Sequence, residues 1–209
     1  MKSTSLIVSA AAIFALATTG AQHITALRQI DFKNFTYAWN DEPQDVPETW
    51  HWLTSPTKMR VRTINGIHHF HNADLDDTVP APRISVDDVA YGDLDGDGVE
   101  EAAVTLNYGT GGTANWSYLY VYKLQAERPM LLARLQAGSR ADDGLIKASI
   151  RDGVLILDFN DPERRVGDCC SEGYIRVHYR WREGRFIEQG RRERGNTNLR
   201  PVPLSPVPN

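Results

Sequence analysis

Five acidic residues gather in the stretch that runs from residue 93 to residue 101. Positions 1, 3, 5 and 9 of this stretch are Asp93, Asp95, Asp97 and Glu101. Calcium prefers six to eight oxygen ligands at about 2.3–2.6 Å, and alternate spacing turns several carboxylates of a short loop inward at once. Gly98 permits the sharp turn, and the carbonyl of Val99 can supply a further oxygen. The stretch therefore predicts a Ca²⁺ site, with a solvated acidic turn as the alternative.

The residues on either side decide which kind of calcium loop this is. A helical EF-hand needs a bidentate Glu at position 12, and Val104 stands there. Residues 102–106 are apolar and strand-like, and residues 84–86 and 89–91 before the loop are strand-like as well. We therefore expect a strand, a calcium loop and a second strand.

Residues 91–104 resemble the calcium-binding hairpin of FG-GAP and VCBS-type repeats, the blades of integrin-like propellers. The resemblance implies a Ca²⁺ site on the acids named above. Glu101 stands where the family usually has Asp, and the motif occurs once, whereas a propeller needs several blades. A dockerin module would need a second loop and helices, which the sequence lacks. The resemblance therefore implies a local site and not a whole fold.

The N-terminus has the pattern of a secretory signal. Lys2 precedes an apolar run over residues 6–17, and small residues suit cleavage after Ala17 or Ala21. We expect a signal peptide at 1–21, one exported domain at 22–200 and a proline-rich disordered tail at 201–209. A secreted or periplasmic location would supply millimolar calcium. No later stretch is apolar enough to cross a bilayer.

Charge is distributed unevenly around a formal net charge of −4. Residues 31–101 hold fifteen acids and five bases, whereas residues 176–200 hold eight arginines and three glutamates. The two regions could pair with each other or be solvated, or the basic one could bind an anionic surface or polysaccharide. An acidic chain argues against nucleic acid as a partner. The sequence leaves the oligomeric state open.

Most of the remaining chain has the period-2 pattern of antiparallel strands. Asn65-Gly66, Asp152-Gly153 and Glu183-Gly184 predict tight hairpin turns. We expect an all-β meander that forms a curled sheet, a sandwich or a partial barrel, without a long amphipathic helix. The expected strands cover 31–37, 59–64, 67–70, 117–124, 130–135, 145–151, 154–159, 174–182 and 185–189. Residues 41–56 are expected to form an ordered loop or a short turn region.

Two strands carry side chains of one kind on one face. The first presents an aromatic stripe, which packs in the core or forms a ligand face that stacks on glycans: Trp116, Tyr118, Tyr120 and Tyr122. The second presents a row of cations, which pairs with neighbouring acids or binds an anion: Arg176, His178, Arg180 and Arg182.

Other chemistry is weakly indicated. A transition metal could bind a cluster of histidines and acids, although no His-Glu-x-x-His helix is present: His68, His69, His71, Asp74, Asp76 and Asp77. No nucleophile elbow or catalytic pair can be identified, so we predict no catalytic residues.

The favoured function is a non-catalytic, calcium-stabilised β domain with a binding or cell-envelope role. The alternatives are a carbohydrate-binding or carbohydrate-active module that uses the aromatic stripe, and a redox-sensitive protein.

Cys169 and Cys170 are adjacent, and in an exported protein they can form a vicinal disulfide. Without reduction, the intact mass is expected to lie two hydrogen masses below that of the dithiol, and alkylation should require a reductant. Because this ring closes essentially no chain loop, its loss should cost less stability than the loss of a long-range disulfide. A monomer that reacts readily with iodoacetamide under oxidising conditions would contradict the pairing.

Overall fold

The computed structural model describes residues 26–39, 50–54, 56–70, 80–112, 114–139, 142–167 and 170–197. The expected signal peptide and the proline-rich tail lie outside these ranges. Antiparallel strands dominate the described residues, which confirms the all-β prediction. No helix in the described ranges is long and apolar enough to span a membrane.

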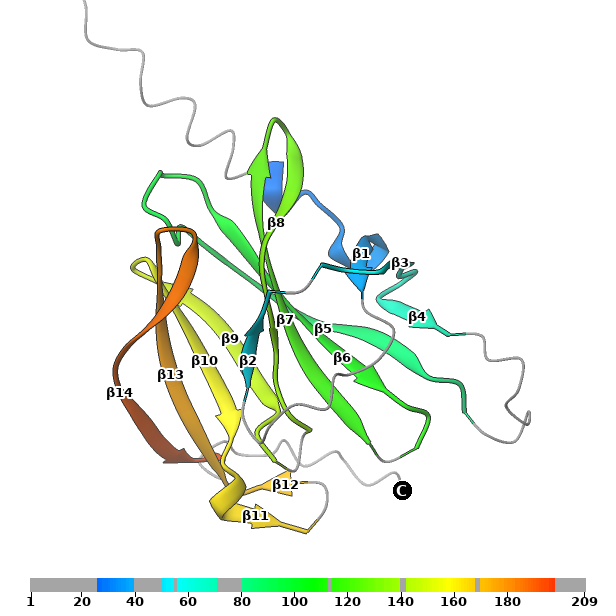
Figure 1. Ribbon diagram of the computed structural model, residues 1–209, viewed down its shortest axis with the longest axis vertical. Coiled ribbons are helices and arrows are strands. Elements are labelled where there is room, and N and C mark those ends of the chain that lie inside the picture. Colours follow the sequence, from blue (N-terminus) through cyan, green and yellow to red (C-terminus); the bar gives the residue numbers. More distant parts are fainter. Residues whose placement is uncertain are drawn as a thin grey trace, which may run out of the picture.

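Two sheets make up most of the domain. Six strands form the larger sheet, in the order β2-β8-β7-β6-β5-β4: β2 (His51–Leu53), β4 (Ile67–His69), β5 (Arg83–Gly92), β6 (Glu101–Gly109), β7 (Asn115–Gln125) and β8 (Arg128–Gln136). Four strands form the smaller sheet, in the order β14-β13-β10-β9: β9 (Leu145–Arg151), β10 (Val154–Asn160), β13 (Gly173–Arg182) and β14 (Arg185–Asn196). The smaller sheet lies on the left in Figure 1.

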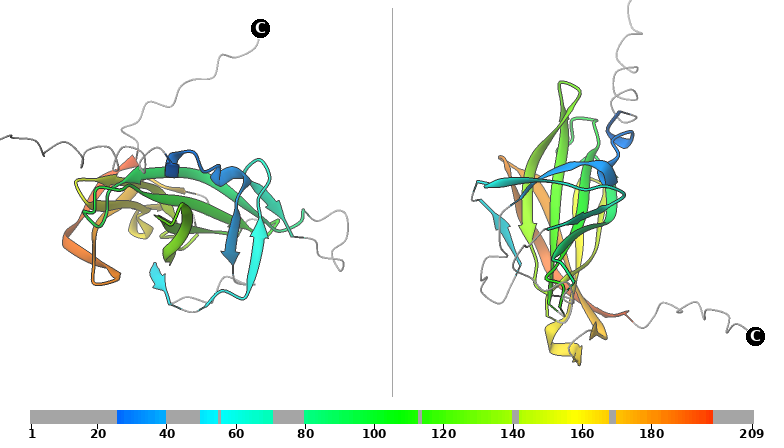
Figure 2. Two further views of the ribbon diagram at one scale, coloured as in Figure 1. Left: turned by 90° about the horizontal axis from the view of Figure 1, so that it is seen from above. Right: turned by 90° about the vertical axis from the view of Figure 1, so that its right-hand side faces the viewer.

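Short elements complete the fold. A ribbon of β1 (Thr36–Trp39) and β3 (Met59–Arg62) and a pair of β11 (Arg165–Val166) and β12 (Cys170–Ser171) accompany the two sheets. The 3₁₀ turns are η1 (Phe32–Asn34) and η2 (Pro162–Arg164). In the left view of Figure 2, the β1–β3 ribbon and the four-stranded sheet lie at opposite ends of the molecule.

The six-stranded sheet buries both of its faces. Side chains alternate across a strand, so Leu119 and Val121 face one core while Tyr118 and Tyr120 face the other. The first core is shared with the four-stranded sheet, including Leu155, Leu157 and Phe159. The second core lies beneath η1, β1 and β3, including Phe32, Tyr37 and Val61. A central sheet covered on both faces explains why the first six residues of β6 are all buried.

The predicted tight turns are present. Asp152 and Gly153 have φ of 51° and 70°, and Glu183 and Gly184 have φ of 51° and 77°. Positive φ at both central residues is the type I′ geometry that matches strand twist. Asn65-Gly66 also turns tightly, but Ile64 and Ile67 form only an isolated bridge. Beyond it β3 pairs with β1 and β4 pairs with β5, so this turn passes the chain between two sheets.

Several expected elements differ from the structure. The first strand begins at Thr36 and not at Asp31, because the Asp31 side chain caps η1 through the backbone N–H groups of Lys33 and Asn34. Within the expected loop at 41–56, residues 51–53 pair with β8. The short strands β11 and β12 had no periodic signal to reveal them. The β7–β8 turn uses Ala126 and Glu127 at φ of 46° and 62°, residue types that do not indicate such a turn.

The aromatic stripe of β7 belongs mainly to the core. Tyr118, Tyr120 and Tyr122 are at most 5% exposed, and Tyr37 of β1 lies edge-on to two of them. The hydroxyl of Tyr120 donates to the carbonyl of Ala38 at 2.8 Å. These three rings therefore cannot form an exposed ligand face, and that alternative is wrong for them. Trp116, at the end of the stripe, is half-buried.

Replacing Tyr120 by alanine is expected to lower the free energy of unfolding by about 3–5 kcal/mol, the usual cost of deleting a buried aromatic ring. Trp116→Ala provides the matched comparison and should cost less, since its ring is only half-buried. Urea denaturation of both variants measures the difference. Equal, near-wild-type stabilities would contradict the buried position of the stripe.

Candidate metal centre

The predicted calcium loop closes the β5–β6 hairpin. Gly92 and Glu101 are the last paired residues of the two strands. Leu94, only 4% exposed, anchors the loop in the core between the sheets. A Cβ at Gly92 would lie 2.5 Å from Cγ2 of Ile150, so glycine allows β5 to approach β9 at the point where the loop begins. The loop is therefore fixed to both sheets.

A second anchor ties the loop to the N-terminal part of the described chain. The guanidinium of Arg28 makes two hydrogen bonds to the carboxylate of Glu100, at 2.6 and 2.7 Å. It also lies over the ring of Tyr91, 4.7 Å from its centroid. Glu100 is thereby paired outside the loop interior, which leaves its neighbour Glu101 as the acid that points inward.

Hydrogen bonds within the loop hold it in a turned conformation. The Asp93 carboxylate accepts from the N–H groups of Gly96 at 2.7 Å and Gly98 at 3.0 Å. Asp95 accepts from the N–H of Asp97, and Asp97 accepts from the N–H of Val99. Gly96 and Gly98 have φ of 80° and 82°, a conformation that glycine adopts without strain. The acids thus organise the loop before any ion is considered.

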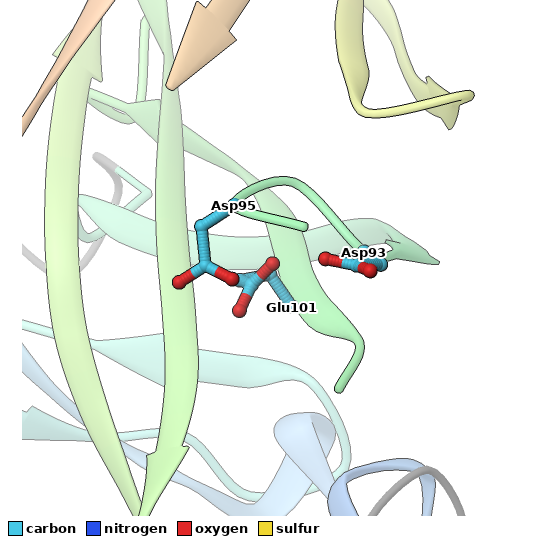
Figure 3. A group of neighbouring side chains, drawn as sticks. All are labelled: Asp93, Asp95 and Glu101. Carbon is cyan, nitrogen blue, oxygen red and sulfur yellow. The ribbon is translucent and has the colours of Figure 1, made fainter. Parts of the chain in front are cut away.

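Three of the predicted ligands come together. Asp93, Asp95 and Glu101 each offer a carboxylate oxygen, and these oxygens lie within 4.8 Å of one another. Figure 3 shows the carboxylates of Asp95 and Glu101 side by side beneath the loop, with Asp93 next to them. In the part of the chain that the structure describes, no other group of three metal-binding side chains is found.

Glu101 is the unusual member of this group. Its side chain is fully buried. Its Oε2 accepts from the N–H of Leu94 at 2.7 Å, whereas its Oε1 has no hydrogen-bond partner. Burial raises the pKa of Glu101 to about 7, and the neighbouring Asp95 acts in the same direction. A buried carboxylate oxygen without a donor is costly, and a cation at this position would remove that cost.

The structure also brings in a residue that the sequence did not indicate. The ammonium of Lys123 on β7 lies 2.5 Å from Oδ2 of Asp95 and 2.5 Å from Oδ2 of Asp97. Burial lowers the pKa of Lys123, but the bonds to Asp95 and Asp97 outweigh this effect and leave it above its usual value. Ala102 pairs with Tyr122, so Lys123 stands next to Glu101 across the strands. The strand register would have revealed it, but the sequence does not fix that register.

The other two predicted ligands are Asp97 and the carbonyl of Val99. Asp97 is exposed and lies outside the group of three, and its Oδ2 binds Lys123. Val99 is half-buried, and its N–H donates to Asp97 at 2.8 Å. Three of the four predicted carboxylates therefore form the group, and the Val99 carbonyl stays a predicted ligand.

The remaining predicted sites receive less support. His68 and His69 are consecutive on β4 and so face opposite sides of the sheet, while His71 and the acids Asp74, Asp76 and Asp77 lie outside the described residues. Cys169 also lies outside them, so the vicinal disulfide stays a prediction. In the cationic row, Arg176 makes a two-pronged ion pair with Asp158 at 2.7 and 2.9 Å. Arg176 thus follows the first alternative for this row, pairing with an acid of the neighbouring strand β10.

Lys123→Met is expected to destabilise the protein in EDTA by about 1 kcal/mol, since partly exposed ion pairs contribute about 0.2–1 kcal/mol each. The loss should be largest at low salt, where the unpaired acids repel one another most strongly. Lys123→Arg, which keeps the charge, is the control. Thermal melts at low and high salt measure the effect, and a Lys123→Met protein as stable as wild type at low salt would show that the ammonium contributes nothing.

No protein family model matches this chain, and no curated protein or solved structure matches it either. The resemblance of residues 91–104 to the FG-GAP and VCBS hairpins therefore stays a prediction.

Proposed function

We propose that this chain is an exported, non-catalytic β domain with a binding or cell-envelope role, and that its β5–β6 loop binds Ca²⁺ as a structural ion. The observation that carries the proposal is the fully buried Glu101 carboxylate. Its Oε1 lacks a donor, and one of its oxygens lies within 4.8 Å of carboxylate oxygens of Asp93 and Asp95. Three carboxylates that converge on one point repel one another. A divalent cation is the ligand that turns this repulsion into attraction.

The donor set fits calcium better than a softer metal. All three side chains offer oxygen, and hard cations prefer oxygen, whereas zinc and copper sites usually include imidazole or thiolate ligands. Asp93, Asp95 and Glu101 would hold the ion. Calcium accepts carboxylates in irregular geometry and completes its ligands with backbone carbonyls and water, which suits a loop that is exposed on its outer side.

The ion would stabilise the contact between the two sheets. Glu101 begins β6, and Leu94 of the same loop packs in the core that the sheets share. An ion that binds the folded loop and not the unfolded chain adds to stability by mass action. The signal-like pattern of residues 1–21 supports export, and extracytoplasmic calcium concentrations can occupy even a weak site.

Calcium and Lys123 would compete for the same acid. The ammonium and the ion both need Asp95, because Asp95 belongs to the group of three and also binds Lys123. Lys123 pairs with the carboxylates of Asp95 and Asp97, but it leaves Oε1 of Glu101 without a donor. The ion pair between Lys123 and Asp95 would therefore belong to the calcium-free protein, and the ammonium would move aside when calcium binds.

A calcium titration of the mature protein, followed by calorimetry and thermal melting, tests the proposal. At about 10–100 times the Kd, binding should add about 1.4–2.7 kcal/mol of stability, which corresponds to a rise in Tm of about 3–10 °C for a chain of this size. Asp93→Asn and Glu101→Gln should abolish most of that rise, because each removes a charged ligand.

Glu172→Gln is the matched control, since Glu172 is exposed and belongs to another part of the chain. It should retain the full response to calcium. Neither heat of binding nor a change in Tm at 10 mM calcium, a concentration about ten times above the weakest extracellular sites, would overturn the calcium assignment.

A further inference from the structure

A cleft of about 490 Å³ opens beside the calcium loop. Three segments far apart in the sequence line it: the start of the loop with Asp93 and Asp95, the β9–β10 turn with Asp152 and Gly153, and the end of β13 with Arg180, Trp181 and Arg182. A Cβ built on Gly153 would lie 3.4 Å from Nη1 of Arg180 and 3.8 Å from the carbonyl oxygen of Asp93. The three segments therefore meet closely, and the cleft has the volume of a small-molecule site.

The arginines of this cleft have no partners among the described residues. Within those ranges, the side chain of neither Arg180 nor Arg182 forms an ion pair or hydrogen bond, and both residues are exposed. Other arginines of the same sheet are paired, including Arg176 with Asp158 and Arg192 with Glu188. The cationic row of β13 thus divides into a paired inner end and an unpaired outer end at the cleft.

A second observation points to an anion at this end. Arg182 lies directly opposite Arg185 across the β13–β14 hairpin, and like charges in that position destabilise a sheet. Both side chains are exposed. A bound anion would relieve the repulsion, and the planar guanidinium matches the geometry of a carboxylate.

The other lining residues suit a sugar. Trp181 is half-buried against Phe186, with ring centroids 4.8 Å apart, so part of the indole is left to contact an apolar ring face. Asp152 is exposed in the neighbouring turn and can accept hydrogen bonds from hydroxyl groups. The third wall carries the carboxylates of Asp93 and Asp95. Asp95 is paired with Lys123, and Asp93 accepts from the N–H groups of Gly96 and Gly98, which limits their repulsion of an anionic ligand.

We propose that this cleft binds an oligosaccharide that carries carboxylate groups. Arg180 and Arg182 bind the carboxylates, Asp152 accepts from sugar hydroxyls and Trp181 contacts a ring. The site is distinct from the buried tyrosines of β7. It goes beyond the calcium proposal and does not rest on it, because the arginines and the tryptophan line the cleft without any ion.

Calorimetry of the mature protein with tetragalacturonic acid tests the proposal. EDTA is present throughout, so that calcium neither bridges the ligand nor fills the loop. The acid should bind, its fully methyl-esterified form should bind at least tenfold more weakly, and added salt should weaken binding of the acid. Arg180→Gln and Arg182→Gln should each lower the affinity about tenfold, as expected for the loss of a charge-assisted hydrogen bond. Inorganic phosphate serves as a second anion. If phosphate binds more weakly than tetragalacturonic acid, the result would support recognition of the sugar.

Arg83→Gln is the control, because Arg83 is exposed at the opposite end of β5 from the loop and should leave binding unchanged. NMR spectra of the wild-type protein provide a test that does not depend on the folding of variants. The indole N–H signal of Trp181, assigned with Trp181→Phe, should shift when tetragalacturonic acid is added. Absence of binding, equal affinity for the acid and its ester, or full affinity in both arginine variants would each overturn the proposal. Binding in EDTA by a protein that ignores calcium would support the cleft while refuting the calcium site.

Discussion

One constraint organises the candidate site: a carboxylate is buried at the edge of the core between the two sheets. Glu101 opens β6 on the same face as Ala103, which belongs to that core. Folding therefore removes the Glu101 side chain from water, and one N–H bond from Leu94 satisfies only one of its oxygens. A charge in this position requires a nearby cation or a bound proton. Lys123 supplies positive charge close by, and the calcium proposal supplies it at the unsatisfied oxygen.

The close approach of the two sheets gives the loop its rigidity. Gly92 has no side chain, so Ile150 of β9 lies directly against β5, and Leu94 enters the shared core two residues later. The loop is thus anchored immediately before its acids begin to converge. A loop fixed in this way loses little conformational freedom when it binds an ion, which lowers the entropic cost of binding.

Burial of both faces of the central sheet decides where a ligand can bind. The tyrosines of β7, which the sequence offered as a sugar platform, are covered by β1 and η1. Exposed functional groups gather instead where hairpin ends meet, at the β5–β6 loop, the β9–β10 turn and the end of β13. The loop and the turn lie beyond the last paired residues of their strands, and Arg180 and Arg182 are exposed at the paired end of β13.

The sequence by itself determined the features that depend on neighbouring residues. Alternation identified most strands, Asp152-Gly153 and Glu183-Gly184 identified two hairpins because positive φ favours these residue types, and the acid spacing identified the loop that brings Asp93, Asp95 and Glu101 together. The tertiary structure alone decided what depends on register and on which sheet a strand joins. It placed Lys123 against Asp95 and Asp97 of the loop, buried the tyrosines and brought Arg180 to the β9–β10 turn. No local pattern encodes these contacts, since they join strands through loops whose length does not fix the pairing.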